Sequence, residues 1–158
     1  MGTAVETDPV EQRAARTREA SLEDASSIAA LMTTLGYPTS AEQMEGRLWA
    51  LLANPEYQTL VALLGEQVVG VIGLHHGRAY EFDGGYTRIV ALSVLPDAEG
   101  AGVGGSLVAA AEQAALARAA VMMIVSSGSY RESAHRFYEG RGFVQTGIRL
   151  VKQLKEGK

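Results

Sequence analysis

A glycine-rich loop between a strand and a helix places the strongest constraint on the fold of this chain. The strand-like segment 86–95 ends at Pro96, and the loop from Gly100 to Gly105 then enters a segment of helical periodicity. Successive glycines let backbone N–H groups approach an anion closely, and the dipole of the following helix adds partial positive charge there. The segment therefore predicts a phosphate or pyrophosphate site, with a tight strand-to-helix turn as the alternative.

The loop does not match two common phosphate-binding motifs. A Walker loop needs Lys followed by Ser or Thr after the glycines, and neither pair follows here. A Rossmann site is disfavoured because the glycines lie late in the chain, behind segments that resemble antiparallel strands. If the glycines hold an anion, they do so in neither of these two phosphate-binding folds.

Hydrophobic periodicity predicts two early helices, an antiparallel meander and then a β-α-β-α-β half. The first helix starts at Ser21 to Asp24 and stops at Gly36, and the second runs from Ser40 to just before Pro55. The remaining segments are strands at 58–64, 67–75 and 86–95, the helix after the glycines, a short buried strand at 121–125, a helix at 131–139 and a final strand pair from 143 onward. This order predicts a mixed α/β or α+β architecture.

Composition fits one globular domain and excludes several classes of function. The length of 158 residues predicts a single domain over 14–158, preceded by a flexible tail at 1–13. A formal charge of -4 is unfavourable for nucleic-acid binding, and no cysteine is present for a disulfide, a thiol nucleophile or a metal site. The N-terminus lacks the features of a signal peptide, and no segment has the apolar length of a membrane span. We therefore expect a cytoplasmic protein with no bound metal and no nucleic-acid or membrane partner.

Two motifs follow one another in the second half of the chain. The first is Gly100-Ala101-Gly102-Val103-Gly104, preceded by Val94-x-Pro96, and about 30 residues later comes Ala134-His135-Arg136-Phe137-Tyr138-Glu139-Gly140-Arg141-Gly142-Phe143. Together they resemble the GNAT superfamily of acetyl-CoA-dependent N-acetyltransferases, over roughly residues 15–155. The resemblance implies a central, mostly antiparallel sheet with a splayed strand pair, flanked by about four helices.

The same resemblance implies where acetyl-CoA binds as cosubstrate. The strand end Leu92-Ser93-Val94 would pair with the pantetheine arm, and the loop Gly100-Ala101-Gly102-Val103-Gly104-Gly105 would hold the pyrophosphate. Tyr138 stands where these enzymes place the general acid that protonates the departing CoA thiolate. A packing role is the alternative for Tyr138, because it shares one helix face with Ala134 and Phe137.

Three residues depart from the pattern of the superfamily. Glu99 stands where relatives carry Gln or Arg; a carboxylate about 4 Å from the pyrophosphate would cost about 4 kcal/mol, so we expect Glu99 to point to solvent. Arg131 replaces a common Asn and is expected to contact the cofactor through its charge. Arg88 stands where several relatives carry the glutamate that acts as general base, and a guanidinium cannot accept a proton at neutral pH. The base is therefore unassigned.

The acceptor site is expected to include His76, Glu81 and Arg88. His76 or Glu81 would relay a proton through water, although each is also explained as an ordinary surface residue. A metal held by His75 and His76 is disfavoured, because adjacent strand residues face opposite sides of a sheet. The acidic chain favours a small cationic amine as acceptor, whereas Arg88 favours an amine that carries a carboxylate.

These observations predict an enzyme that transfers an acetyl group from acetyl-CoA to a primary amine on a small molecule, by direct attack in a ternary complex. A catalytically silent acyl-CoA-binding or regulatory domain is one alternative, because Glu99 and the missing strand carboxylate depart from the catalytic pattern. A structural module without a ligand is the other. Strands near the C-terminal end permit a homodimer, and no motif identifies the acceptor amine.

Overall fold

The computed structural model describes residues 14–126 and 132–156. They form two compact parts, one within residues 1–124 and the other within 125–158. The N-terminal part holds three α-helices, and the C-terminal part holds helix α4 (Glu132–Glu139). The predicted tail at 1–13 and Arg131 lie outside the described residues, and a single domain over 14–158 stays a prediction.

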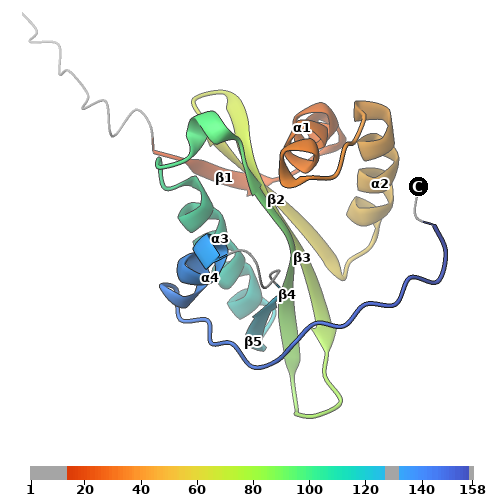
Figure 1. The fold of residues 1–158 in the computed structure, drawn as a ribbon, viewed down its shortest axis with the longest axis vertical. Helices are drawn as coiled ribbons and strands as arrows, with labels where there is room; N and C mark the ends of the chain where they lie inside the picture. The colour runs from red at the N-terminus through yellow and green to blue at the C-terminus, as the bar shows by residue number, and fades with distance from the viewer. Residues whose placement is uncertain (1–13, 127–131, 157–158) are drawn as a thin grey trace, which may run out of the picture. The chain divides into compact units, whose positions relative to one another are not determined.

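A five-stranded sheet, with its strands in chain order, forms the centre of the N-terminal part (Figure 1). The first four strands pair antiparallel, each with its neighbour. The strands are β1 (Arg16–Glu19), β2 (Tyr57–Leu64), β3 (Gln67–Arg78), β4 (Gly85–Val94) and β5 (Ala120–Val125). This mostly antiparallel sheet confirms the mixed α/β class that the order of segments predicts.

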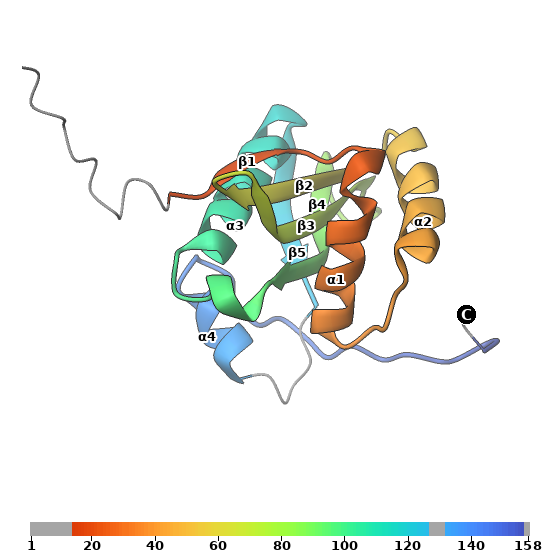
Figure 2. The ribbon, with the colours of Figure 1, turned by 90° about the horizontal axis from the view of Figure 1, so that it is seen from above.

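Helices cover both faces of the sheet (Figure 2). Helices α1 (Ala25–Leu35) and α2 (Ala41–Ala53) lie on one face, and α3 (Val103–Ala117) lies on the other. The apolar core under α1 and α2 includes Ile28, Leu31, Leu48, Val61 and Val71. Because successive strand residues point to opposite faces, each central strand supplies side chains to both layers.

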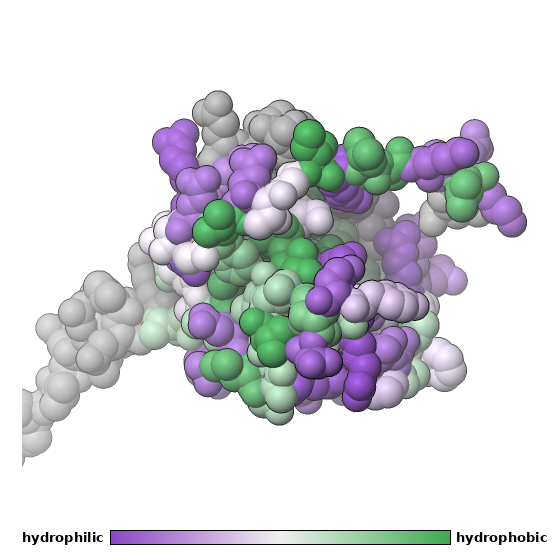
Figure 3. Space-filling view, turned by 90° about the horizontal axis from the view of Figure 1, so that it is seen from below, coloured by the Kyte–Doolittle hydropathy of each residue, from purple (hydrophilic) through white to green (hydrophobic). Residues whose placement is uncertain are grey.

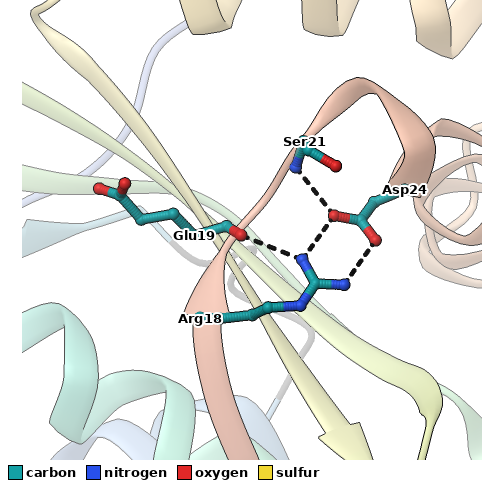
Figure 4. A network of polar contacts seen from close by, with 4 residues as sticks. All are labelled: Arg18, Glu19, Ser21 and Asp24. Carbon is teal, nitrogen blue, oxygen red and sulfur yellow. Dashed lines mark hydrogen bonds and ion pairs between the residues drawn. The ribbon is translucent and has the colours of Figure 1, made fainter.

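A bidentate ion pair joins β1 to the start of α1 (Figure 4). Nη1 and Nη2 of Arg18 donate to the carboxylate of Asp24 at 2.8 and 2.9 Å, and the N–H of Ser21 donates to the same carboxylate at 2.8 Å. The hydrogen bond from Arg18 is the main cause that lowers the pKa of Asp24 below its ordinary value. The predicted helix start at Ser21 to Asp24 is therefore also a contact between the sheet and the helix layer.

Close packing of α3 on β3 fixes where the glycine loop lies. A Cβ at Gly70 would lie 2.8 Å from Cγ1 of Val103 and 3.0 Å from Cδ1 of Leu107. Val103 and Leu107 belong to the first two turns of α3, and both are buried. The absence of a side chain at Gly70 thus lets the N-terminal end of α3 approach the sheet.

Two predictions for the last third of the chain are wrong. Residues 143–156 form no regular strand or helix, and the five large apolar side chains between 144 and 154 are 72–91% exposed. Strand β5 is not a buried strand, because Val121 and Met122 are both exposed. Apolar side chains also reach the surface on the face shown in Figure 3. Strand propensity alone did not specify a pairing partner for residues 143–156.

Candidate functional site

The glycine loop follows the short 3-10 turn η3 (Pro96–Ala98) and leads directly into α3. Gly100 and Gly102 have φ values of 82° and 76°, which residues with a side chain rarely adopt. A Cβ at either position would meet nothing within 4 Å. The two glycines are therefore required by the backbone conformation, and they leave open space beside the loop.

The first turn of α3 presents backbone hydrogen-bond donors beside this open space. The first four N–H groups of a helix have no intrahelical acceptor, and the N-cap residue Gly102 brings no side-chain cap. The first bond of the helix runs from the N–H of Ser106 to the carbonyl of Gly102 at 3.0 Å. The N–H groups of residues 102–105 and the helix dipole together fit an anion such as a pyrophosphate.

Glu99 and the end of β4 border the loop. Glu99 is exposed, as its expected orientation toward solvent requires. The end of β4 pairs with β3, where Leu92 lies opposite Ile72, Ser93 opposite Val71 and Val94 opposite Gly70. Ser93 is buried and its hydroxyl donates to the carbonyl of Leu31 at 2.7 Å, so its side chain holds α1 against β4. At Ser93, only the backbone is therefore suited to pairing with the expected pantetheine arm, which is rich in amide groups.

An irregularity in β4 opens onto an apolar cavity under α1 and α2. Gly73 pairs with Ala91 and Leu74 pairs with Ile89, so Val90 is an extra residue in β4 and forms a bulge. The cavity has a volume of about 100 Å³. Its lining residues include Met32, Met44, Leu51, Tyr57, Val90 and Ala91.

A row of rings leads from this cavity along β3 and β4. The ring centroids of Tyr57 and His75 lie 4.8 Å apart, and those of His75 and Tyr86 lie 6.0 Å apart. The guanidinium carbon of Arg88 lies 5.6 Å from the centroid of Tyr86. His75 and Arg88 are also direct cross-strand partners. We call Tyr57, His75, Tyr86 and Arg88 the ring cluster.

Comparison with known families identifies the chain. The model of the acetyltransferase (GNAT) family matches residues 22–143, which is more than half of the sequence. The chain belongs to the GNAT family. It is therefore an acyltransferase, and GNAT acetyltransferases use acetyl-CoA as cosubstrate. The resemblance carried by the two sequence motifs is confirmed.

Relatives of this GNAT protein agree in sequence and in fold. Aminoalkylphosphonate N-acetyltransferase of Salmonella typhimurium is 32% identical over 138 residues, which are 87% of this chain and 90% of that protein. A GNAT family acetyltransferase of Staphylococcus aureus has a TM-score of 0.78 at 24% identity, over 89% of this chain and 99% of that chain. An aminoglycoside acetyltransferase from an uncultured soil metagenomic sample has a TM-score of 0.75 at 18% identity, over 89% of this chain and 97% of that chain. The two solved structures show a shared fold.

His76, expected at the acceptor site of this GNAT protein, is a buried residue in a polar chain. The amide nitrogen of Gln58 donates to Glu19 at 3.1 Å, so the amide oxygen of Gln58 accepts from Nε2 of His76 at 2.9 Å. Nδ1 of His76 then accepts from the hydroxyl of Thr87 at 2.8 Å. Both ring nitrogens are engaged, which argues against proton relay from His76 to an acceptor.

Burial also sets the protonation state of His76. Desolvation is the main cause that lowers its pKa below 6.5, and the charges of Arg118 and His75 act in the same direction. Within the described part of the chain, the carboxylate that joins this network is that of Glu19, which contacts the Gln58 amide and does not contact the His76 ring. The neutral imidazole is therefore part of the folded structure at neutral pH.

The lowered pKa of His76 predicts a pH-dependent stability. The unfolded chain binds a proton at His76 more readily than the folded chain, so the stability contributed by the neutral ring is complete above about pH 6.5. We expect it to be lost as the pH falls from there through the lowered pKa of the folded state. Urea unfolding between pH 5 and 8 should show a steeper loss for wild type than for His76→Gln. His135→Gln is the matched control, and equal slopes for wild type and His76→Gln would contradict the prediction.

The remaining candidates lie in separate places. Glu81 is exposed in the turn between β3 and β4, and Arg88 is exposed on β4. Tyr138 belongs to α4 in the C-terminal part, where its ring contacts those of Phe137 and Phe143 at centroid distances of 5.2 and 5.5 Å. Among the described residues, no group of three His, Asp or Glu side chains is arranged to hold a metal ion. No helix within residues 14–126 and 132–156 is long and apolar enough to span a membrane.

Tyr57 and Tyr86 are absent from the candidate site residues predicted from the sequence, and His75 enters there only as a disfavoured metal ligand. The alternation of side chains along β3 is the signal that could have found them. His76 is buried and His75 faces the other side of the sheet, so His75 shares a face with its ring neighbours. Tyr86 lies opposite Gly77, and a Cβ at Gly77 would lie 2.5 Å from the Tyr86 ring. A glycine paired with an aromatic residue therefore marked the place where the ring crosses β3.

Proposed function

We propose that this protein transfers the acetyl group of acetyl-CoA to a primary amine on a small molecule, by direct attack in a ternary complex. The observation that carries the proposal is the glycine loop. Its two left-handed glycines, its open space and the uncapped first turn of α3 form a donor set suited to a pyrophosphate. Membership of the GNAT family supports the choice of acetyl-CoA over other pyrophosphate-containing ligands.

The reaction needs few functional groups from the protein. The amine nitrogen attacks the thioester carbonyl carbon, a C–N bond forms, the C–S bond breaks and coenzyme A leaves as a thiolate. In the proposal, Tyr138 gives its hydroxyl proton to that thiolate, and the proton of the attacking amine passes to water or a nearby base. Backbone groups of Leu92 to Val94 hold the pantetheine arm, and Arg131 adds charge to the binding of the cofactor.

Small amines are the acceptor class that we propose. The Salmonella relative is named for aminoalkylphosphonates, and its identity of 32% over most of both chains supports testing this class first. Simple cationic amines, which the acidic net charge favours, are the second class to test. Arg88 cannot act as the base expected at its strand position, so the proton of the attacking amine must pass to another group or to water.

Two measurements test the proposed function. Acetyl-CoA should raise the melting temperature and bind one site per chain, because a ligand that binds only the native state stabilises it by mass action. A panel of amines, with release of coenzyme A as the readout, should then identify acceptors. Binding without release for any amine would contradict the proposed transfer to small amines. No calorimetric heat and no thermal shift at millimolar acetyl-CoA would contradict the proposed cosubstrate.

A further inference from the structure

We propose that the ring cluster is the acceptor site, and that Arg88 binds an anionic group carried by the acceptor amine. The substrate class is therefore a small primary amine that also bears a phosphonate or a carboxylate. This inference rests on the proposed N-acetyltransferase function and adds the residues that select the acceptor.

The positions along β4 place the ring cluster beside the expected reaction centre. If the pyrophosphate lies at the loop after Val94 and the pantetheine arm pairs with residues 92–94, the thioester lies beyond Leu92, near the bulge at Val90. Arg88 is two residues further along the same strand, about 7 Å from Val90. An anion held by Arg88 thus leaves the amine of a short molecule close to the bulge and to the cavity that Val90 lines.

The ring cluster is a preformed wall rather than a set of independent side chains. Tyr86 lies across β3 at Gly77, where a Cβ would lie 2.5 Å from its ring. Tyr86 and Tyr57 flank His75, whose side chain is 22% exposed. Arg88 lies above the Tyr86 ring, an arrangement that holds the flat guanidinium while leaving its N–H groups directed to other partners.

The charges around Arg88 favour an anionic ligand. Among the described residues, Arg88 has no ion pair and no hydrogen bond, in contrast to Arg18, which is paired with Asp24. The carboxylate recorded beside the ring cluster is that of Glu56, and it lies 3.8 Å from Nε2 of His75. An unneutralised guanidinium in a chain of net charge -4 is complementary to a phosphonate or a carboxylate, which it can bind with two N–H groups.

Steady-state kinetics with three short amines tests this assignment. The amines are 2-aminoethylphosphonate, β-alanine and n-propylamine, which carry a phosphonate, a carboxylate and no anion. The readout is the ratio of kcat/KM for each anionic amine to kcat/KM for propylamine. In Arg88→Gln this ratio should fall about 10-fold to 100-fold, the range expected for lost hydrogen bonds to a charged group. The ratio for Arg88→Lys should lie between those of wild type and Arg88→Gln, because lysine keeps the charge and lacks the two parallel N–H donors of the guanidinium.

Arg78→Gln is the matched control, since it removes the same charge from an exposed residue at the end of β3 and should leave the ratio unchanged. A larger effect for 2-aminoethylphosphonate than for β-alanine would identify phosphonate as the preferred anion, and the reverse would identify carboxylate. Two outcomes would overturn the inference while leaving the proposed function standing. One is a ratio near one in wild type, and the other is a ratio in Arg88→Gln that equals the wild-type ratio. No release of coenzyme A with any amine would overturn both.

Discussion

Replacing Gly104 by Val is expected to abolish measurable binding of acetyl-CoA while the protein stays folded. Gly104 lies in the first turn of α3, where its N–H is one of the donors without an intrahelical acceptor. A branched side chain there would occupy space that the pyrophosphate needs and would shield neighbouring N–H groups. Two lost hydrogen bonds to a charged ligand correspond to a weakening of about 100-fold or more. Titration calorimetry with acetyl-CoA measures the effect directly.

The structure makes Gly104 a better test position than Gly102. Gly102 has a φ of 76°, so a valine there would strain the backbone whether or not a ligand binds. A valine in a helix has a propensity no worse than that of glycine, so Gly104→Val should keep its melting temperature in the absence of ligand. Gly46→Val, at an exposed site in α2 with open space around it, is the control. An unchanged affinity of Gly104→Val for acetyl-CoA would show that the glycines of the loop have a purely structural role.

Local signals in the sequence were sufficient for the helices and the central meander. Ser40 and Gln43 predict the start of α2, and both bonds of the capping box are present, from the N–H of Gln43 to Ser40 Oγ at 3.1 Å and from the N–H of Ser40 to Gln43 Oε1 at 2.9 Å. Strand β1 was missed, because Arg16–Glu19 is a short, polar and fully exposed segment. It is a strand only through its pairing with β2, which no local pattern encodes.

The candidate site was predictable where backbone conformation constrains the residue type. Glycines at 100 and 102 are required by positive φ values, so their pattern in the sequence was informative. The roles of His75 and His76 depend instead on which face of the sheet is covered by α3. Alternation showed that the two rings point to opposite sides, but only the tertiary structure shows that His76 is the buried one and that His75 joins the ring cluster.

Tyr138→Phe should lower kcat about 100-fold and leave the affinity for acetyl-CoA nearly unchanged. A proton donor that acts on the leaving thiolate stabilises the transition state more than the ground state, so its loss appears in kcat rather than in binding. The ring of Tyr138 contacts Phe137 and Phe143, and phenylalanine keeps that ring. Its packing is therefore preserved while the hydroxyl is removed. Steady-state rates with a saturating amine, together with a binding titration, give the two quantities.

The melting temperature separates a chemical role of Tyr138 from a structural one. If the phenol donates a proton, Tyr138→Phe should lower kcat while the melting temperature and the affinity for acetyl-CoA stay those of wild type, whereas a structural role would lower the melting temperature as well. Tyr80→Phe, at a fully exposed position in the turn after β3, is the control and should keep both the rate and the melting temperature of wild type. A Tyr138→Phe enzyme with wild-type kcat would show that water protonates the thiolate.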